Sequence, residues 1–464
     1  MPALSRRFIC QACGALSAKW AGQCPRCGQW NSLAEEQASQ QGSLTPLDSI
    51  PMTTHARRPT SFAEVDRVLG GGLVPGSVVL LGGEPGIGKS TLLLQLAAAL
   101  ATADGPACYI SGEESAQQIK LRAERLHLRG QHVLVAAETD LSAALAILER
   151  SHPGLAIVDS VQALRDPKVE GGPGTLAQVR QCALALAHWA KGHDTPVVLA
   201  GHVTKDGALA GPKALEHLVD VVLYLEGDTQ GPYRLLRGAK NRFGSTNEVG
   251  VFEMGDQGLR GVPDASKHFL SERSVGAAGS AVVPVMEGTR PLLVEVQALT
   301  TPTAFGTPRR AANGLDYNRL LLIAAVLTRR AGLPLAAQDI MVSAVGGLRV
   351  EEPAADLALA LAIASSYHNR PLDPGLVAIG EVGLTGEIRA VGQVERRLAE
   401  AAALGFATAL VPASLAGTIA TGKALRPLFA RTVIEALRLA NLSGRAAQAA
   451  SAEAVARTPL EADI

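Results

Sequence analysis

Nine consecutive residues, Gly83 to Thr91, have the composition of a loop that binds phosphate. They read GEPGIGKST and match the pattern GxxxxGK[ST]. An apolar run, VVLLG, precedes them and a helix-like run, LLLQLAAALA, follows. In such a loop the glycines let backbone N–H groups surround the phosphates, Lys89 reaches the β- and γ-phosphates, and the Ser90 hydroxyl binds Mg²⁺. The sequence therefore predicts an ATP site. The residues assigned to the nucleotide and its Mg²⁺ are Gly83, Glu84, Pro85, Gly86, Ile87, Gly88, Lys89, Ser90, Thr91 and, as argued next, Asp159.

Two acidic positions follow apolar runs further along the chain. Asp159 ends the run 155–159, where a carboxylate can hold the Mg²⁺ shell, although an aspartate followed by a serine can also cap a helix. Glu113 follows the run 107–111 and would orient and deprotonate the attacking water, because ligands of parallel sheets bind at the carboxyl ends of the strands. An exposed loop acid is the alternative for Glu113. We expect Lys89 and Glu113 to act in hydrolysis.

Four cysteines near the N-terminus have the spacing of a metal site. Cys10, Cys13, Cys24 and Cys27 form two CxxC pairs separated by ten residues. Each pair can turn two thiolates toward one ion, so the four sulfurs would close a structural zinc site. Thiols without a metal are the alternative. Trp20 and nearby basic residues would let this finger contact either DNA or protein.

Composition limits the classes of protein to consider. Of the 464 residues, 47% are apolar and 19% are charged, which is typical of globular domains and not of disordered or fibrous chains. Basic and acidic residues are equal at 43 each, so nucleic-acid binding would have to be local. No apolar run reaches the roughly 18 residues of a membrane helix. We therefore expect a cytoplasmic protein with no membrane partner, in which thiols stay reduced.

Composition also changes along the chain, which indicates several domains. A polar, Gln- and Ser-rich stretch follows the cysteines, apolar runs then alternate with helical ones as in a mainly parallel α/β sheet, and a Gly/Ser-rich joint precedes a third region. The expected parts are a zinc finger (1–30), a linker (31–49), an ATPase domain (50–268), a C-terminal α+β domain (269–446) and a flexible tail (447–464).

The motifs taken together resemble those of a known family. GEPGIGKST, YISGEES, LAIVDSVQ, AGHVTKDG and KNRFG occur in this order behind the four cysteines, and the whole chain resembles the RadA (Sms) family of bacterial DNA repair proteins. This resemblance implies a RecA-like P-loop ATPase core, a catalytic role for Glu113, and Gln162 and His202 near a γ-phosphate sensor. It also implies a hexameric ring, with single-stranded and branched DNA and the RecA recombinase as partners.

The motif KNRFG is the signature element of that family and is matched by residues 240–244. Lys240 and Arg242 lie two residues apart, so on an extended segment both can project into the nucleotide of a neighbouring subunit. A basic residue that stabilises charge on the transferring phosphoryl group contributes about 10³–10⁵ in rate, so we assign both residues a catalytic role. A solvated basic turn and a phosphate contact on DNA are the alternatives.

The region from about residue 270 resembles the proteolytic domain of Lon, which uses a serine and a lysine. Ala354 stands where that family has its serine and Glu395 where it has its lysine. Neither residue can act as nucleophile or base, so the resemblance predicts a Lon-like domain without protease activity.

Together these features predict a DNA-dependent ATPase: a ring-shaped translocase or helicase for single-stranded DNA, acting in branch migration and D-loop extension in DNA repair. An ATP-dependent protease and a RecA-type scaffold or signalling ATPase are the alternative functions.

Overall fold

The computed structural model describes eleven stretches of the chain, which form two compact units, Met1–His55 and Ala56–Ile464. The described residues are 8–10, 16–17, 19–30, 33–35, 47–49, 57–202, 215–227, 231–304, 306–346, 349–419 and 425–442. The two units are described separately below. The expected flexible tail, 447–464, lies outside the described residues.

The first unit contains a small antiparallel sheet with the order β2-β1-β3. Its strands are β1 (Phe8–Cys10), β2 (Leu16–Ser17) and β3 (Leu33–Glu35). The strand β3 and a short 3-10 turn, η1 (Leu47–Ser49), both fall within the stretch that we expected to be a linker. Because β3 pairs with β1, at least the start of that stretch is part of the metal-binding module.

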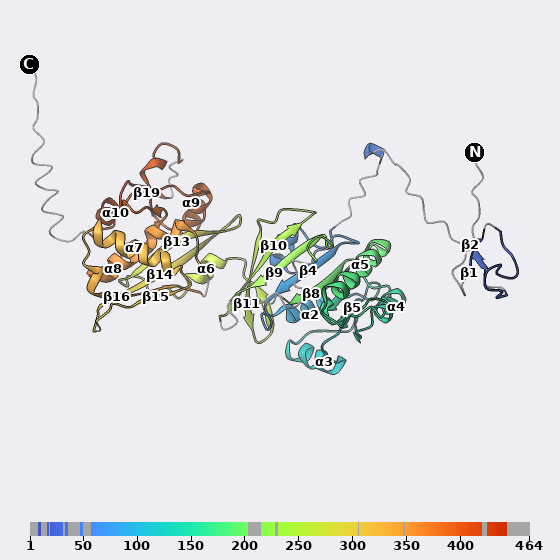
Figure 1. Cartoon of the computed structure of the whole chain (residues 1–464). Helices are drawn as coiled ribbons and strands as arrows, with labels where there is room; N and C mark the ends of the chain where they lie inside the picture. The colour runs from blue at the N-terminus through green and yellow to red at the C-terminus, as the bar shows by residue number, and fades with distance from the viewer. Residues whose placement is uncertain are drawn as a thin grey trace, which may run out of the picture. The chain divides into compact units, whose positions relative to one another are not determined.

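A nine-stranded sheet organises the first half of the second unit (Figure 1). Its order is β12-β11-β10-β9-β4-β8-β7-β5-β6, and the six strands from β9 to β6 are parallel. The parallel strands are β4 (Val78–Gly83), β5 (Ala107–Ser111), β6 (Val133–Ala137), β7 (Leu155–Asp159), β8 (Val197–His202) and β9 (Val221–Glu226). Three antiparallel strands extend one edge: β10 (Tyr233–Asn241), β11 (Val249–Gly255) and β12 (Gly258–Gly261).

Helices cover both faces of this sheet because its central strands are apolar on both faces. In β4, Val79 and Leu81 join the core that includes α2, whereas Val78 and Leu80 join a second core that includes α4 and α5. This alternation follows the two-residue period of a strand. The helices of this half are α1 (Ala63–Leu69), α2 (Lys89–Leu100), α3 (Ala116–Arg125), α4 (Leu141–Ser151) and α5 (Leu176–His193), with a 3-10 turn η2 (Val161–Ala163) after β7.

The second half of this unit is built on a seven-stranded mixed sheet with the order β15-β16-β14-β13-β17-β20-β21. The helix α8 (Asp356–His368) is buried along most of its length against β13 and β14. The strands are β13 (Ser280–Glu287), β14 (Arg290–Pro302), β15 (Arg310–Asn313), β16 (Gln338–Ala344), β17 (Leu376–Ala378), β20 (Thr408–Pro412) and β21 (Arg426–Ala430), beside a small hairpin of β18 (Glu381–Val382) and β19 (Ile388–Arg389). The remaining helices are α6 (Ala265–Phe269), α7 (Tyr317–Arg329), α9 (Val394–Ala403) and α10 (Val433–Leu439), with 3-10 turns η4 (Leu335–Ala337), η5 (Pro353–Ala355) and η6 (Ala413–Leu415).

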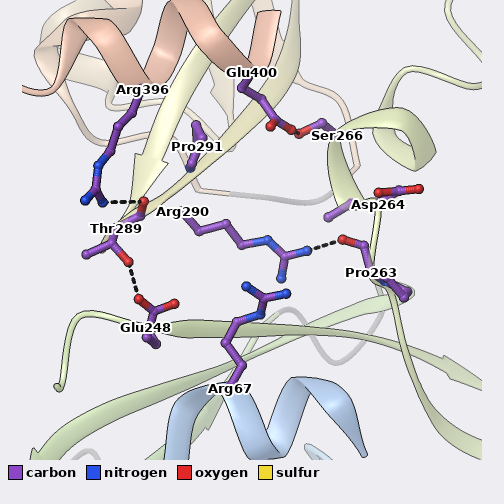
Figure 2. Close-up of a pocket in the computed structure, with 11 residues that line it drawn as sticks. Arg67, Glu248, Pro263, Asp264, Ser266, Thr289, Arg290, Pro291, Arg396 and Glu400 are labelled. Carbon is purple, nitrogen blue, oxygen red and sulfur yellow. Dashed lines mark hydrogen bonds between the residues drawn. The ribbon is translucent and has the colours of Figure 1, made fainter. Parts of the chain in front are cut away.

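Polar contacts join the two halves of this unit around a cavity of about 410 Å³ (Figure 2). Arg290 of β14 donates to a carboxylate oxygen of Glu64 in α1 at 2.5 Å and to the carbonyl of Val262 at 3.2 Å. Helix α6 follows the nine-stranded sheet in sequence, and Ala265 and Phe269 pack in the core of the second half. That core also includes Leu235, Val249 and Val251 of β10 and β11, so the two halves share it.

Candidate nucleotide-binding site

The phosphate loop lies between the carboxyl end of β4 and the first turn of α2. Gly83 and Gly88 are held against other strands: a Cβ at Gly83 would lie 2.6 Å from the Leu225 carbonyl oxygen, and one at Gly88 would lie 2.6 Å from the Met254 side chain. Gly86 instead faces open space and has a φ of +78°. The backbone can thus curve tightly and leave its N–H groups at a helix N-terminus, where phosphate oxygens bind.

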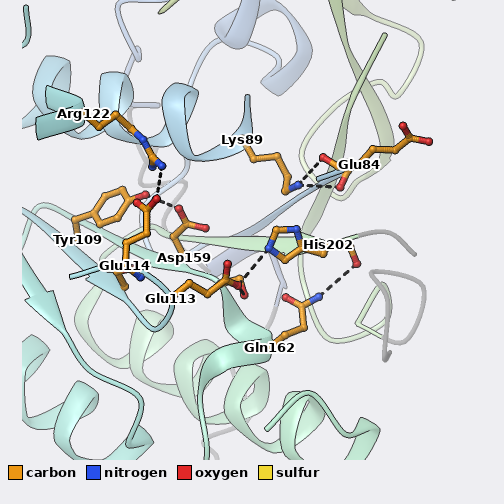
Figure 3. Close-up of polar contacts among 12 residues, drawn as sticks. Glu84, Lys89, Tyr109, Glu113, Glu114, Arg122, Asp159, Gln162 and His202 are labelled. Atoms are coloured by element: carbon orange, nitrogen blue, oxygen red, sulfur yellow. Dashed lines mark hydrogen bonds and ion pairs between the residues drawn. The ribbon is translucent and has the colours of Figure 1, made fainter. Parts of the chain in front are cut away.

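Lys89 folds back over this loop (Figure 3). Its ammonium donates to the carbonyls of Gly83 at 2.8 Å and Glu84 at 2.9 Å, and its side chain is buried. Burial lowers the pKa of Lys89, and the carboxylates of Asp159 and Glu113 oppose that shift. A cationic group that holds two loop carbonyls can exchange them for phosphate oxygens, so the loop fits a bound triphosphate.

Asp159 ends β7 next to the end of β5, because Ser111 and Asp159 are register partners. It is buried, and its Oδ2 accepts a hydrogen bond from the hydroxyl of Tyr109 at 2.5 Å (Figure 3). The peptide bond between Asp159 and Ser160 is cis. A buried carboxylate opposite the phosphate loop fits the oxygen ligands that Mg²⁺ prefers.

Glu113 lies just beyond the carboxyl end of β5 and is held through one oxygen. Its Oε1 accepts a hydrogen bond from the Ser160 hydroxyl and lies 3.2 Å from Nε2 of His202. The hydrogen bond from His202 is the largest cause that lowers the pKa of Glu113 to about 2, and those from Ser160 and the charge of Lys89 act in the same direction. The carboxylate is therefore ionised and near Lys89.

The neighbours of Glu113 include the other expected sensor residue. Gln162 of η2 donates to the carbonyl of His202 at 3.5 Å (Figure 3), and His202 is the last residue of β8. The structure thus brings together, at the carboxyl ends of the parallel strands, Lys89, Glu113, Asp159, Gln162 and His202.

Lys240 and Arg242 lie toward the opposite end of the strands, where the parallel strands begin. Asn241 of β10 pairs with Val221, the first residue of β9, while the phosphate loop leaves the other end of β4. Lys240 donates to the carbonyls of Glu216 and Val219, and Arg242 forms an ion pair with Asp220 at 2.9 Å. Burial, and then the charge of Arg242, lower the pKa of Lys240. Through β9, Lys240 lies level with Leu80 and Asn241 with Val79, three and four residues before Gly83, which is about 10–13 Å along the strand at ~3.3 Å per residue.

Sequence reasoning missed three residues that support the site. Arg234 of β10 is buried and donates from Nε to the carbonyl of Ile87 at 3.1 Å, so it braces the phosphate loop from an antiparallel strand. Tyr109 and Ser160 contact the two acids. Arg234 and Tyr109 lie in strands, where a polar group among apolar residues was the one sign of a role in the site. Ser160 was considered only as part of a helix cap.

The expected metal site is partly described. Cys24 is buried and Cys27 is exposed on one turn, in which the Gly28 N–H donates to the Cys24 carbonyl at 2.9 Å and Gly28 has a φ of +73°. Cys10 is the last residue of β1, and Cys13 lies outside the described residues. The tight turn between Cys24 and Gly28 fits a metal knuckle.

The positions that correspond to a protease dyad carry no such chemistry. Ala354 is buried in η5, and Glu395 is exposed in α9. Nearby, Glu352 and Arg397 form a two-point ion pair, with nitrogen to oxygen distances of 2.6 and 2.7 Å. A structural ion pair thus lies near the position of the dyad.

The site has the architecture of a P-loop ATPase of the RecA type. A phosphate loop joins the central strand β4 of a parallel sheet to a helix, and two acids lie at the ends of β5 and β7, which pair with each other. Family models agree with this architecture: an AAA domain matches residues 45–208, a rubredoxin metal binding domain matches residues 8–35, and subunit ChlI of Mg-chelatase matches residues 322–414. The expected fold class, with a P-loop core, an N-terminal metal ribbon and a Lon-like C-terminal domain, is confirmed.

Curated relatives match nearly the whole chain. The DNA repair protein RadA of Listeria monocytogenes is 48% identical over 446 residues (94% of this chain and 98% of the relative), and that of Bacillus subtilis is 46% identical over 447 residues (93% and 98%). The chain belongs to the RadA family of DNA repair proteins, and its core is an ATPase. Among solved structures, a KaiC-like protein of Pyrococcus horikoshii is 18% identical, with a TM-score of 0.37, covering 45% of this chain and 99% of that protein. Among the described residues, no helix has the length and apolar character needed to span a bilayer.

Proposed function

We propose that this chain is a DNA-dependent ATPase that assembles into a hexameric ring and moves along single-stranded DNA in the cytoplasm. Its work would be branch migration and D-loop extension on recombination intermediates, with single-stranded and branched DNA as partners and the RecA recombinase as a further one. The names of its relatives support a role in DNA repair.

One observation carries the assembly part of this proposal: Lys240 and Arg242 lie toward the end of the strands away from their own phosphate loop. From the level of Leu80 and Val79 neither side chain reaches the end of β4, so we expect a contact of either with nucleotide to need a second subunit. The main-chain and carboxylate partners that hold them in the single chain would position them for that contact.

The site residues divide the chemistry of hydrolysis. Gly83 to Thr91 would enclose the phosphates, Lys89 would neutralise the β- and γ-phosphates, and Ser90 and Asp159 would hold Mg²⁺, which would supply positive charge to the phosphate oxygens. Glu113 orients the water for in-line attack. Lys240 and Arg242 stabilise negative charge on the phosphoryl group from the neighbouring subunit.

The N-terminal ribbon would hold Zn²⁺ through Cys10, Cys13, Cys24 and Cys27. Four thiolates close the tetrahedral shell, so the ion stabilises the ribbon and takes no part in hydrolysis. The exposed Trp20 and Trp30 are the apolar surface that this ribbon offers to DNA or to another protein.

Mixed oligomers test the assembly part. Lys89→Ala subunits lack a working phosphate loop, and Lys240→Ala subunits keep theirs but lack the donated lysine. Each variant alone should be nearly inactive, and mixing them should restore ATPase activity, because each Lys240→Ala site can then receive Lys240 from a Lys89→Ala neighbour.

Absence of rescue would contradict action between subunits and leave Lys240 with a role inside its own chain, such as holding the segment of Glu216 and Val219. Mixing Lys89→Ala with Glu113→Gln subunits is the control, because both changes damage the same phosphate edge and should give no rescue.

Two rival functions give different results. A scaffold ATPase would show no stimulation by single-stranded DNA, whereas we expect stimulation that weakens steeply as salt rises. An ATP-dependent protease would degrade casein with ATP, which Ala354 and Glu395 argue against.

A further inference from the structure

Two hydroxyl groups connect the proposed catalytic acids across neighbouring strands. Tyr109 of β5 donates to Asp159 at the end of β7, and Ser160, the residue after β7, donates to Glu113 beyond the end of β5. Each strand thus supplies one acid and the hydroxyl that holds the acid of its neighbour. We call this arrangement, formed by Tyr109, Asp159, Ser160 and Glu113, the crossed brace.

The two hydroxyl donors of the crossed brace and Asp159 are buried, whereas Glu113 is exposed. Tyr109 is 1% exposed and Ser160 is 0% exposed, so neither hydroxyl has bulk water as an alternative partner. A buried hydroxyl without a partner costs about 1–3 kcal/mol, so each donor is kept on its carboxylate. Tyr109 lies within β5, and Ser160 directly follows β7, which pairs with β5.

Each hydrogen bond also selects which oxygen of an acid is used for chemistry. The Tyr109 hydroxyl occupies Oδ2 of Asp159 and so leaves Oδ1 for a cation. The Ser160 hydroxyl and His202 both approach Oε1 of Glu113, which leaves Oε2 for water.

We propose that Tyr109 and Ser160 are positioning residues of ATP hydrolysis with separate tasks: Tyr109 orients Asp159 toward Mg²⁺, and Ser160 orients Glu113 toward the attacking water. This inference rests on the roles of Asp159 and Glu113 proposed above. It predicts that removing one hydroxyl impairs metal binding alone and that removing the other impairs turnover alone.

Tyr109→Phe deletes a single oxygen and keeps the ring that packs in the core. Loss of a partner that orients a metal ligand weakens metal affinity by about 10–100-fold. We expect the Mg²⁺ concentration for half-maximal ATPase to rise by about 10-fold, with kcat at saturating Mg²⁺ close to that of the wild type.

Ser160→Ala removes one of the two contacts to Oε1 of Glu113 and leaves the contact of 3.2 Å to His202, so the carboxylate is held less firmly. A displacement of about 1 Å in a reacting group can cost about 100-fold in rate. We expect kcat to fall by about 10–100-fold, while the Mg²⁺ dependence and the affinity for nucleotide remain unchanged.

Metal binding is also measured without turnover. Mn²⁺ replaces Mg²⁺ in the presence of ADP, and electron paramagnetic resonance gives its dissociation constant for the full-length chain. Tyr109→Phe should raise that constant by about 10-fold, and Ser160→Ala should not change it. The double variant should show both the higher Mn²⁺ dissociation constant of Tyr109→Phe and the lower kcat of Ser160→Ala.

Two variants match these changes elsewhere in the chain. Ser266→Ala removes another buried serine hydroxyl that donates to a carboxylate, that of Glu400 at 2.6 Å. Tyr233→Phe removes a phenol oxygen at the start of β10. Both should keep the wild-type Mn²⁺ affinity and kcat, and unfolding midpoints with metal-free ADP binding verify that every variant is folded.

The inference is overturned if Tyr109→Phe binds Mn²⁺ as the wild type does, if Ser160→Ala keeps the wild-type kcat, or if both variants lose both quantities equally. Asp159→Asn and Glu113→Gln separate this failure from failure of the proposed function. If those two are impaired while Tyr109→Phe and Ser160→Ala are not, only the crossed brace is wrong. If Asp159→Asn and Glu113→Gln also bind and hydrolyse normally, the assignment of the acids is wrong.

Discussion

Glu113 shows how single contacts decide what a carboxylate can do. With a pKa of about 2, lowered mainly by the hydrogen bond to His202, it stays ionised at neutral pH and accepts a proton poorly. In the proposed hydrolysis we therefore expect Glu113 to orient the water, and we expect the proton to go to a stronger base, such as a phosphate oxygen. Sequence reasoning had assigned Glu113 both tasks.

Removal of His202 should change the pH dependence of hydrolysis. His202→Ala deletes the largest cause of the lowered pKa, so the pKa of Glu113 should rise toward its ordinary 4.5. The acid limb of kcat against pH should move to higher pH, as a steady-state pH profile measures.

The same shift has a consequence for stability. Because the folded pKa lies below the unfolded one, Glu113 contributes stability that is fully present above about pH 4.5 and is lost as pH falls through about 2. In His202→Ala the folded and unfolded pKa values of Glu113 should lie closer together, so Glu113 should contribute less to the free energy of unfolding. His193→Ala is the control for the pH profile of kcat, because it removes a comparable contact of 3.2 Å, between His193 of α5 and Glu149, away from the site. If the acid limb of kcat moved equally in His193→Ala, the assigned effect of His202 on Glu113 would be contradicted.

At the scale of elements, α1 and β14 are joined by a buried charge pair between Glu64 and Arg290. Glu64 is 1% exposed and accepts from Arg290 and from the N–H of Val251, and Arg290 also donates to the carbonyl of Pro263. Arg290, on a strand of the C-terminal sheet, therefore contacts both helix α1 and the segment that follows β12, the last strand of the ATPase sheet.

Arg290→Met should destabilise this unit strongly. Breaking a buried ion pair by removing one partner costs about 3 kcal/mol or more, and here the buried Glu64 carboxylate would keep only the longer ion pair with Arg67, at 3.7 Å. Denaturant unfolding measures the loss. Adding Glu64→Gln should recover part of it, since the amide carries no charge and can still accept from Val251.

Arg396→Met provides the matched control. Arg396 borders the same cavity but is exposed, and it donates to the carbonyl of Thr289 at 3.2 Å. Its replacement should change stability by no more than about 0.5 kcal/mol. Equal losses for Arg290→Met and Arg396→Met would show that burial of the pair is not what stabilises the junction.

At the scale of the whole molecule, the metal ribbon and the rest of the chain form separate units. A ribbon of three short strands has little core of its own, and metal binding contributes about 10–16 kcal/mol to the folding of such modules. Loss of the metal should therefore unfold the first unit without unfolding the second.

Cys27→Ser, or chelation of the wild type, should abolish zinc binding while the calorimetric transition of the larger unit stays at its wild-type temperature. Zinc content and calorimetry measure the two effects. Cys108→Ser is the control, because Cys108 is buried in the ATPase core: it should keep its zinc and lower that transition. A lowered transition after chelation would contradict the independence of the two units.

The sequence by itself determined those features whose chemistry is local. Gly83 to Ser90 predict a phosphate loop because consecutive residues at fixed spacing can surround phosphates. Asp159 and Glu113 were predicted as its acids because Asp159 ends one apolar run and Glu113 follows another. The alternation of strands and helices predicted the parallel sheet, and the resemblance to Lon placed Ala354 where that family has its nucleophile.

Only the tertiary structure decided which residues from distant segments meet. Tyr109 and Ser160 reach the two acids because β5 pairs with β7, which follows it by about 45 residues, and not only with the next strand, β6. Arg234 reaches the phosphate loop, and Lys240 lies away from it, because β10 runs antiparallel and places its two ends at opposite ends of the parallel strands. Strand order and direction arise from packing across the whole core, so no local pattern contains them.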